Sequence, residues 1–234
     1  MNQPTIYMVT DIETTMRKRI AFDVAWKGID RRGKEYGRGS FIVTDALKLD
    51  VPYFKEKLGW YFSDTYKHMI TPLSMEEIRE EYNNQVSNLL ELGHKVVFCA
   101  YNAGFDAKYL SQTSIELINK RFLKHKIQLL DIWQYWCMSA PQLFNYVTPK
   151  GNPKTSAEAV YRYEMHEPEF AERHIAFSDV EIEADILLKV LRRKKPIPLV
   201  NTPAELMSSP WRLLKDRAIF EGAPDNGKVI IIER

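Results

Sequence analysis

The stretch TIYMVTDIE, residues 5–13, runs from a short series of β-forming residues directly into two carboxylates. The series is short and rich in branched and aromatic side chains, so it predicts a β-strand that ends at Asp11. Residues i and i+2 share one face of a strand, so Asp11 and Glu13 are expected to point the same way. Two close carboxylates repel each other unless a cation lies between them, and hard oxygen ligands suit Mg²⁺ or Mn²⁺. An isolated Asp-x-Glu pair, however, is more typical of a solvated strand end.

Further strands are expected on the C-terminal side of this stretch. Residues 20–28 and 36–44 flank a turn signal at 30–33, so the first three strands are predicted to form a meander. Residues 95–100 and 127–132 are short apolar runs typical of buried strands. Strands first, followed by strands that alternate with helices, predict an α/β fold in which helices flank a mixed sheet.

Helices are predicted between and after these strands. Ser74 and Glu77 form a capping box for a helix that Gly93 ends. The remaining expected helices cover residues 105–110, 133–138, 155–165 and 178–191, with a helical turn at 211–214. Residues 45–72 are expected to be irregular, and residues 218–221 are expected to pair with 229–233.

A turn and an acid follow the predicted strand at 95–100. They are Asn102-Ala103-Gly104-Phe105-Asp106. Open α/β sheets bind ligands at the carboxyl ends of their strands, so Asp106 is well placed for a site. Taken alone, the pattern is equally typical of an acid at the start of a helix.

A third pattern is His174-Ile175-Ala176-Phe177-Ser178-Asp179. Five residues of helix turn through about 500°, so His174 and Asp179 would face different ways on one helix. Ser178 and Glu181 have the spacing of a capping box, which predicts that Asp179 opens the helix and that His174 lies on the preceding loop. A loop histidine can fold back over a metal site. Taken singly, Asp179 is more typical of an acid that complements a helix dipole.

The three patterns together, in this order, resemble the DEDD superfamily of 3′–5′ exonucleases in its histidine-containing branch. The first family motif corresponds to residues 11–15, the second to residues 102–106, and the third, His-x-Ala-x-x-Asp, to residues 174–179. The tyrosine-containing branch would place tyrosine where this chain has Ile175. The family often has glycine after the two threonines, where this chain has Met16.

The resemblance implies an α/β, ribonuclease-H-like fold over residues 1–195, with a C-terminal extension at 196–234 to which it gives no role. It implies that Asp11, Glu13 and Asp179 hold one divalent metal ion and that Asp11 bridges to a second, which Asp106 supports through water. Both ions would be Mg²⁺ or Mn²⁺. His174 would be the general base, because imidazole changes charge near neutral pH. The implied substrate contacts are Thr14, Thr15, Asn102 and Phe105.

The implied partner is a nucleic acid with a free 3′ end, from which 5′-mononucleotides would be released. Single-stranded DNA is the favoured substrate, and short RNA hydrolysed at the same site is the runner-up. A different class of function is a binding module that retains the fold without hydrolysis. A third class is a subunit whose tail docks on a polymerase or another replication partner, and a homodimer also stays open.

Composition sets wider limits on the function. The chain has 234 residues, of which 45% are hydrophobic, which is ample for a packed core. Its 33 basic and 31 acidic residues neither demand nor exclude nucleic acid. No secretory signal and no apolar run of about 18 residues is evident, so a cytoplasmic protein without a membrane partner is expected. Cys99 and Cys137 lie in apolar runs and are predicted to be buried free thiols, with a disulfide between them as the alternative.

Overall fold

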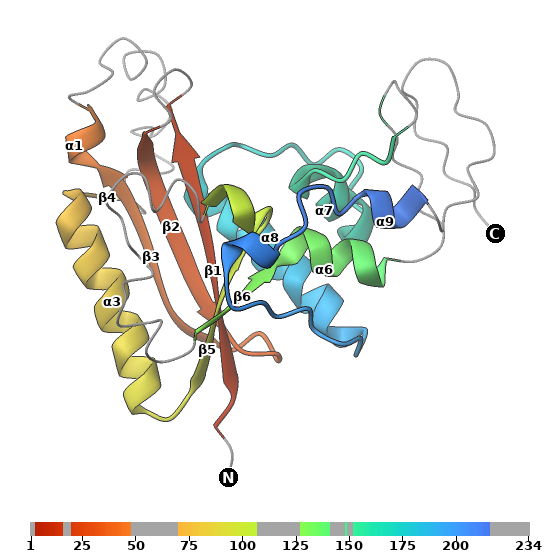
Figure 1. Ribbon diagram of the computed structural model, residues 1–234. Coiled ribbons are helices and arrows are strands. Elements are labelled where there is room, and N and C mark those ends of the chain that lie inside the picture. The colour runs from red at the N-terminus through yellow and green to blue at the C-terminus, as the bar shows by residue number, and fades with distance from the viewer. Residues whose placement is uncertain are drawn as a thin grey trace.

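The computed structural model describes residues 3–15, 20–47, 70–106, 127–140, 148 and 152–215. They build an α/β fold around a six-stranded mixed sheet with the strand order β4-β3-β2-β1-β5-β6. Helix α3 covers one face of this sheet, and helices α6, α7 and α8 lie on the other side (Figure 1). The predicted mixed sheet with flanking helices is confirmed at this level.

The first three strands form the expected meander. They are β1 (Thr5–Thr14), β2 (Ala21–Ile29) and β3 (Glu35–Val43), and both pairings are antiparallel. The prediction that β1 ends at Asp11 is wrong. The ladder continues because Asp11 pairs with Ala25 and Glu13 pairs with Asp23. The two carboxylates therefore stand on a paired, twisted strand instead of a free end, and the register shifts immediately after Glu13.

Three parallel pairings complete the sheet. Strand β5 (Lys95–Ala100) pairs with β1, and β6 (Gln128–Asp131) pairs with β5. Strand β4 (Thr71–Leu73) pairs with β3 at the sheet edge, although the sequence predicts irregular structure up to residue 72. Three residues are too few for a periodic signal, and Pro72 is tolerated because an edge strand leaves one side unpaired.

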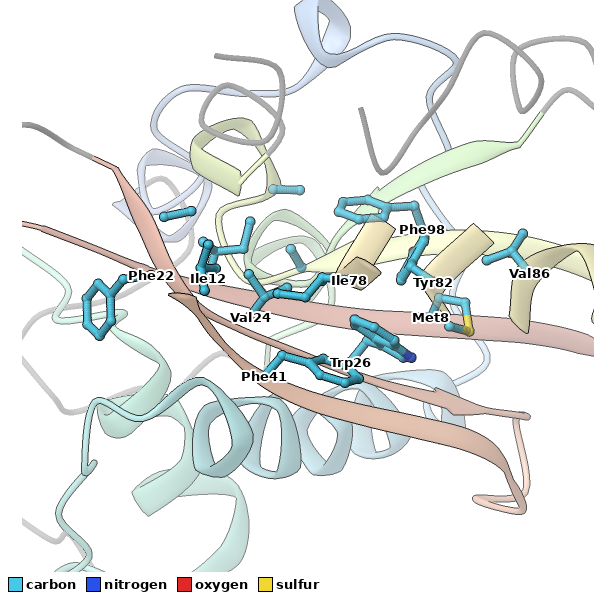
Figure 2. Close-up of a cluster of buried hydrophobic side chains, with 14 of the residues drawn as sticks. Met8, Ile12, Phe22, Val24, Trp26, Phe41, Ile78, Tyr82, Val86 and Phe98 are labelled. Carbon is cyan, nitrogen blue, oxygen red and sulfur yellow. The ribbon is translucent and has the colours of Figure 1, made fainter. Parts of the chain in front are cut away.

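Helix α3 (Met75–Glu91) begins and ends as its sequence predicts. Ser74 and Glu77 form the capping box, and Gly93 adopts a φ of +82° after the last turn. Its apolar stripe packs on the sheet against the large side chains of Met8, Trp26 and Phe98 (Figure 2). The buried members of the stripe are Ile78, Tyr82, Val86 and Leu89.

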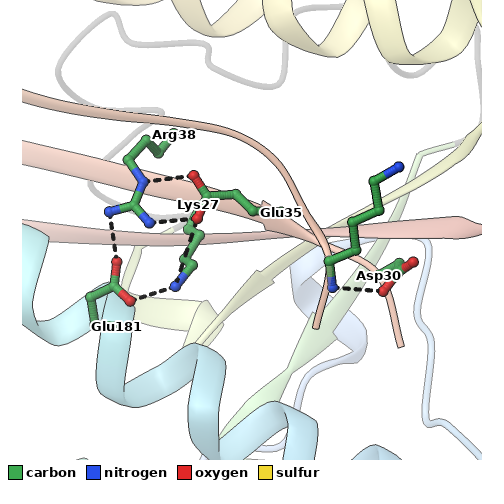
Figure 3. Close-up of polar contacts among 6 residues, drawn as sticks. Lys27, Asp30, Glu35, Arg38 and Glu181 are labelled. Atoms are coloured by element: carbon green, nitrogen blue, oxygen red, sulfur yellow. Dashed lines mark hydrogen bonds and ion pairs between the residues drawn. The ribbon is translucent and has the colours of Figure 1, made fainter. Parts of the chain in front are cut away.

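A second core fills the opposite face of the sheet. Helices α6 (Ile132–Ser139), α7 (Ala157–Met165) and α8 (Ala176–Arg192) pack there around Val9, Val97 and Trp136. Ion pairs join α8 to the strands beneath it, since Glu181 binds both Lys27 and Arg38 (Figure 3). Cys99 and Cys137 are free and buried in this core, as expected.

The start of α8 differs from its prediction. The helix begins at Ala176, its N-cap is Ile175, and no side chain of the cap residue bonds to the helix. Ser178 is therefore not the cap, and Asp179 lies within the first turn instead of opening the helix. The reason is tertiary: the Ala176 N–H donates to Asp23 Oδ2 on β2 at 2.9 Å. A carboxylate 153 residues away in the sequence satisfies the helix terminus that the local pattern assigned to Ser178.

Shorter elements occupy the remaining described residues. Helix α1 (Thr44–Leu47) follows β3, the 3₁₀ turn η1 spans Pro203–Glu205, and α9 (Arg212–Lys215) matches the predicted helical turn. Val200 forms a β-bridge with Leu129, so part of the C-terminal extension joins the sheet edge. The predicted pairing of 218–221 with 229–233, and most of the helix predicted at 105–110, lie outside the described residues. Within the described ranges, no helix has both the length and the apolar character needed to cross a bilayer.

Candidate metal centre

The face of β1 that carries Asp11 and Glu13 is the face covered by α8. Val9, two residues before Asp11, packs in the same core as the α8 side chains, and alternation places all three on one side. Helix α8 brings Asp179, which is only 4% exposed, against this face from its first turn. Two elements far apart in the sequence therefore bring their carboxylates onto one face of the sheet.

His174 completes a compact group with two of these acids. One ligand atom from each of Glu13, His174 and Asp179 lies within 4.8 Å of the other two. The backbone of His174 is left-handed, with φ +53°, which is uncommon for residues other than glycine. His174 precedes the helix, as predicted, and its side chain is exposed. The carboxylates of the group are more enclosed than its imidazole.

Asp106 reaches the site from the turn after β5. Asn102 takes the left-handed conformation with φ +63°, and its carbonyl accepts a hydrogen bond from Phe105 N at 2.8 Å. A helical turn begins at Ala103, two residues earlier than predicted. This turn buries Asp106 to 2% exposure at the carboxyl end of a parallel strand.

The electrostatics of Asp11 show that the four predicted carboxylates form one cluster. Burial raises the pKa of Asp11 well above its usual value, and the negative charges of Glu183, Asp179, Asp106 and Glu13 raise it further. Burial likewise raises the pKa of Asp106, backbone hydrogen bonds lower it, and repulsion from Asp131 and Glu13 adds to the rise. Acids in such a cluster hold protons until a cation offsets their mutual repulsion.

Two enclosed carboxylate oxygens have no hydrogen-bond partner among the described residues. They are Asp11 Oδ2 and Asp106 Oδ1. An unsatisfied buried polar atom is uncommon and costs free energy, so each calls for an explanation such as an ion. Carboxylate oxygens form a donor set that accepts Mg²⁺ or Mn²⁺, and the His174 imidazole lies within 4.8 Å of two of these carboxylates. The residues of the cluster therefore fit a divalent cation.

Glu183 is a fifth carboxylate of this region that sequence reasoning missed. It is 3% exposed and follows Asp179 by four residues, so both lie on the same face of α8. Its Oε2 accepts the backbone N–H of Tyr101 at 3.2 Å. The i to i+4 spacing from a suspected ligand on a predicted helix was the signal that could have identified it.

Asp131 was also missed, and it fixes the turn that carries Asp106. It is the N-cap of α6, and its Oδ1 accepts hydrogen bonds from Gln134 N and Asn102 N, both at 3.2 Å. Burial raises its pKa to about 6, against the lowering effect of these hydrogen bonds. One side chain thus anchors both the start of α6 and the turn after β5.

The predicted substrate contacts differ in their exposure. Thr15 is fully buried, and its hydroxyl accepts a hydrogen bond from Ile20 N at 3.3 Å. Thr14 is 8% exposed, whereas Asn102 is exposed and Phe105 is partly exposed. Asn102 and Phe105 are therefore the two predicted contacts with open surface.

Comparisons with protein-family models and with curated proteins returned no match for this chain.

Proposed function

We propose that this chain is a metal-dependent 3′–5′ exonuclease with a ribonuclease-H-like fold. The observation that carries the proposal is the group of Glu13, His174 and Asp179, whose ligand atoms lie within 4.8 Å of one another. The unpartnered oxygens of Asp11 and Asp106 support it, since they lie in the same cluster. A meander followed by parallel strands is the sheet arrangement that the resemblance implies.

The acids of the cluster would hold the cations. Asp11, Glu13 and Asp179 would bind one ion, and Asp11 and Asp106 would serve a second. Two divalent ions supply positive charge to the attacking and leaving oxygens of a phosphodiester and increase the acidity of water. A bound cation would give Asp11 Oδ2 and Asp106 Oδ1 the partner that they lack among the described residues.

His174 would act as the general base. Its ring nitrogen would accept a proton from the water that attacks the last phosphorus, as the bond from that phosphorus to the 3′ oxygen of the preceding nucleotide breaks. That 3′ oxygen would take a proton from solvent and become a hydroxyl. Exposure suits this role, because a protonated imidazole at the surface can return its proton to solvent. The products are a 5′-mononucleotide and a chain shorter by one residue.

Single-stranded nucleic acid is the proposed substrate, with DNA favoured and short RNA as the alternative. A 2′-hydroxyl is recognised through one or two contacts, so the same carboxylate cluster is compatible with either sugar. Exposed Asn102 and partly exposed Phe105 are the predicted contacts whose open surface is available to the terminal nucleotide. An aromatic ring stacks on any base, which suits hydrolysis without sequence preference.

Degradation of 5′-labelled single-stranded DNA and RNA tests this proposal directly. Each oligonucleotide is incubated with the full chain and Mg²⁺, Mn²⁺ or EDTA. A ladder that shortens from the 3′ end and requires metal is expected, and Asp11→Asn should abolish it. Glu181→Gln is the matched control, since Glu181 lies on α8 but binds Lys27 and Arg38. Absence of cleavage by folded protein with either metal would contradict the proposal and leave a binding role.

A further inference from the structure

Glu183 is a buried acid that is not one of the four predicted carboxylates. It is 3% exposed and faces the sheet from the second turn of α8. Within the ranges that the structure describes, no lysine, arginine or histidine forms a salt bridge with it. Its Oε2 accepts a hydrogen bond from Tyr101 N at 3.2 Å. A buried carboxylate without a cation is rare, because burial disfavours its charged form.

Glu183 interacts electrostatically with the two acids that have unsatisfied oxygens. Among the charged groups that raise the pKa of Asp11, Glu183 has the largest effect. Asp106 has the largest effect among the charged groups that raise the pKa of Glu183, followed by Asp179. Asp106 itself is 2% exposed and leaves Oδ1 unpartnered within the same cluster. The hydrogen bond from Tyr101 N and the four-residue spacing from Asp179 on α8 therefore place Glu183 beside the turn that carries Asp106.

A purely structural role does not account for the residue type. If Glu183 served only to accept the Tyr101 N–H, a glutamine would accept the same hydrogen bond without adding repulsion. A fifth buried acid instead makes the metal-free fold less stable at neutral pH. That cost is offset where divalent cations occupy the cluster, since each cation attracts every nearby carboxylate.

We propose that Glu183 is a fifth carboxylate of the metal centre and that its negative charge increases the affinity of the centre for divalent cations. This inference rests on the proposed function. Two divalent ions balance the charges of Asp11, Glu13, Asp106 and Asp179, and Glu183 adds one surplus negative charge. The surplus favours cation binding before a substrate contributes its own phosphates.

Titration of the full chain with Mn²⁺ by calorimetry, without nucleic acid, tests the inference. Glu183→Gln keeps the side-chain volume and the acceptor for Tyr101 N but removes the charge. Loss of an outer ligand of a metal site costs about 10–100-fold in affinity, and a loss in this range is expected. Glu181→Gln removes a charge from the same helix at a site bound to Lys27 and Arg38, so its Mn²⁺ affinity should equal that of the wild type.

Thermal unfolding supplies a second readout, in which the metal-free unfolding temperature and the rise caused by Mn²⁺ should change in opposite directions in the variant. Without metal at pH 8, Glu183→Gln should unfold at a higher temperature than the wild type, because a buried carboxyl must either hold a proton or add repulsion, whereas an amide does neither. The rise in unfolding temperature on adding Mn²⁺ should be smaller in the variant, because it binds the ion more weakly. A residue with only a packing role would lower the first value and leave the second unchanged.

The outcomes separate this inference from the proposed function. Wild-type protein that binds Mn²⁺ while Glu183→Gln binds it equally well would overturn the role of Glu183 alone. Wild-type protein that binds no Mn²⁺ would overturn both proposals. If Glu183→Gln does not fold, Glu183→Asp keeps the charge on a shorter side chain, and a Mn²⁺ affinity closer to wild type than that of Glu183→Ser is expected. Equal affinities of those two variants would overturn the inference.

Discussion

Asp23 on β2 caps helix α8, because its Oδ2 accepts the Ala176 N–H at 2.9 Å. Asp23 also lies directly opposite Glu13 in the β1–β2 ladder. The same residue therefore sets the position of the helix that carries Asp179 relative to the strand that carries Glu13. His174 is two residues before the capped position, so its placement depends on the same hydrogen bond.

Asp23→Ala should lower both stability and hydrolysis. Loss of an N-cap costs about 0.5–2 kcal/mol, and a buried N–H left without a partner adds to it. Urea unfolding measures the first effect, and the oligonucleotide assay measures the second. Ser156→Ala is the matched control, since Ser156 caps α7 through Ala159 N. It should lose comparable stability and keep full activity; equal losses of activity in both variants would refute the link between the Asp23 cap and the site.

His174→Ala should reduce the turnover number by about 10²–10⁴-fold, the usual contribution of a general base. Binding of a labelled oligonucleotide, measured by fluorescence anisotropy in Ca²⁺, should change little. His166→Asn is the control, since His166 is exposed at the end of α7. A His174→Ala variant that retains the wild-type turnover number would exclude the role of base.

The metal-free protein should lose stability as the pH rises from about 4 to above 6. Burial and repulsion raise the pKa of Asp11, Asp106 and Glu183, and burial raises that of Asp131 to about 6. An acid whose pKa is raised in the folded state stabilises the fold fully at a pH below its pKa in the unfolded state, which is near 4. This stabilisation is lost as the pH rises past the pKa of the acid in the folded state. Glu35, whose pKa Arg38 lowers, acts with the opposite sign only at more acidic pH.

Calorimetric unfolding in EDTA at several pH values checks this dependence. Added Mn²⁺ should reduce the loss at high pH, because the cation binds the ionised carboxylates. A metal-free protein that becomes more stable between about pH 5 and pH 8 would contradict the assigned pKa directions.

Gly39→Ala should destabilise the fold by about 1–3 kcal/mol, the usual cost of overpacking. A Cβ at position 39 would lie 2.5 Å from Phe41 Cε2 and 2.5 Å from Trp26 Cζ2. Gly104→Ala is the contrasting variant, because a Cβ there meets no atom of the described residues within 4 Å. Position 104 is helical, so alanine should stabilise it by about 0.5–1 kcal/mol. Urea unfolding of both variants measures the difference, and a larger loss at 104 than at 39 would count against the packing shown.

Much of the architecture followed from local patterns. The meander, the parallel strands β5 and β6, and both ends of α3 depend on side-chain alternation, turn residues and a capping box within a few positions of one another. Such signals act over short distances, so a single sequence contains them. The three motifs also identified Glu13, His174 and Asp179, whose ligand atoms lie within 4.8 Å of one another.

Tertiary structure decided what depends on contacts between distant residues. Strand β1 extends to Thr14 because β2 pairs with it, and α8 begins at Ala176 because Asp23 accepts its N–H. Glu183 belongs to the acidic cluster because α8 packs its inner face on β1 and β2, which no local pattern states. The sequence thus contains the residue types that can bind a metal, whereas the packing of α8 on the sheet decides which of them come together.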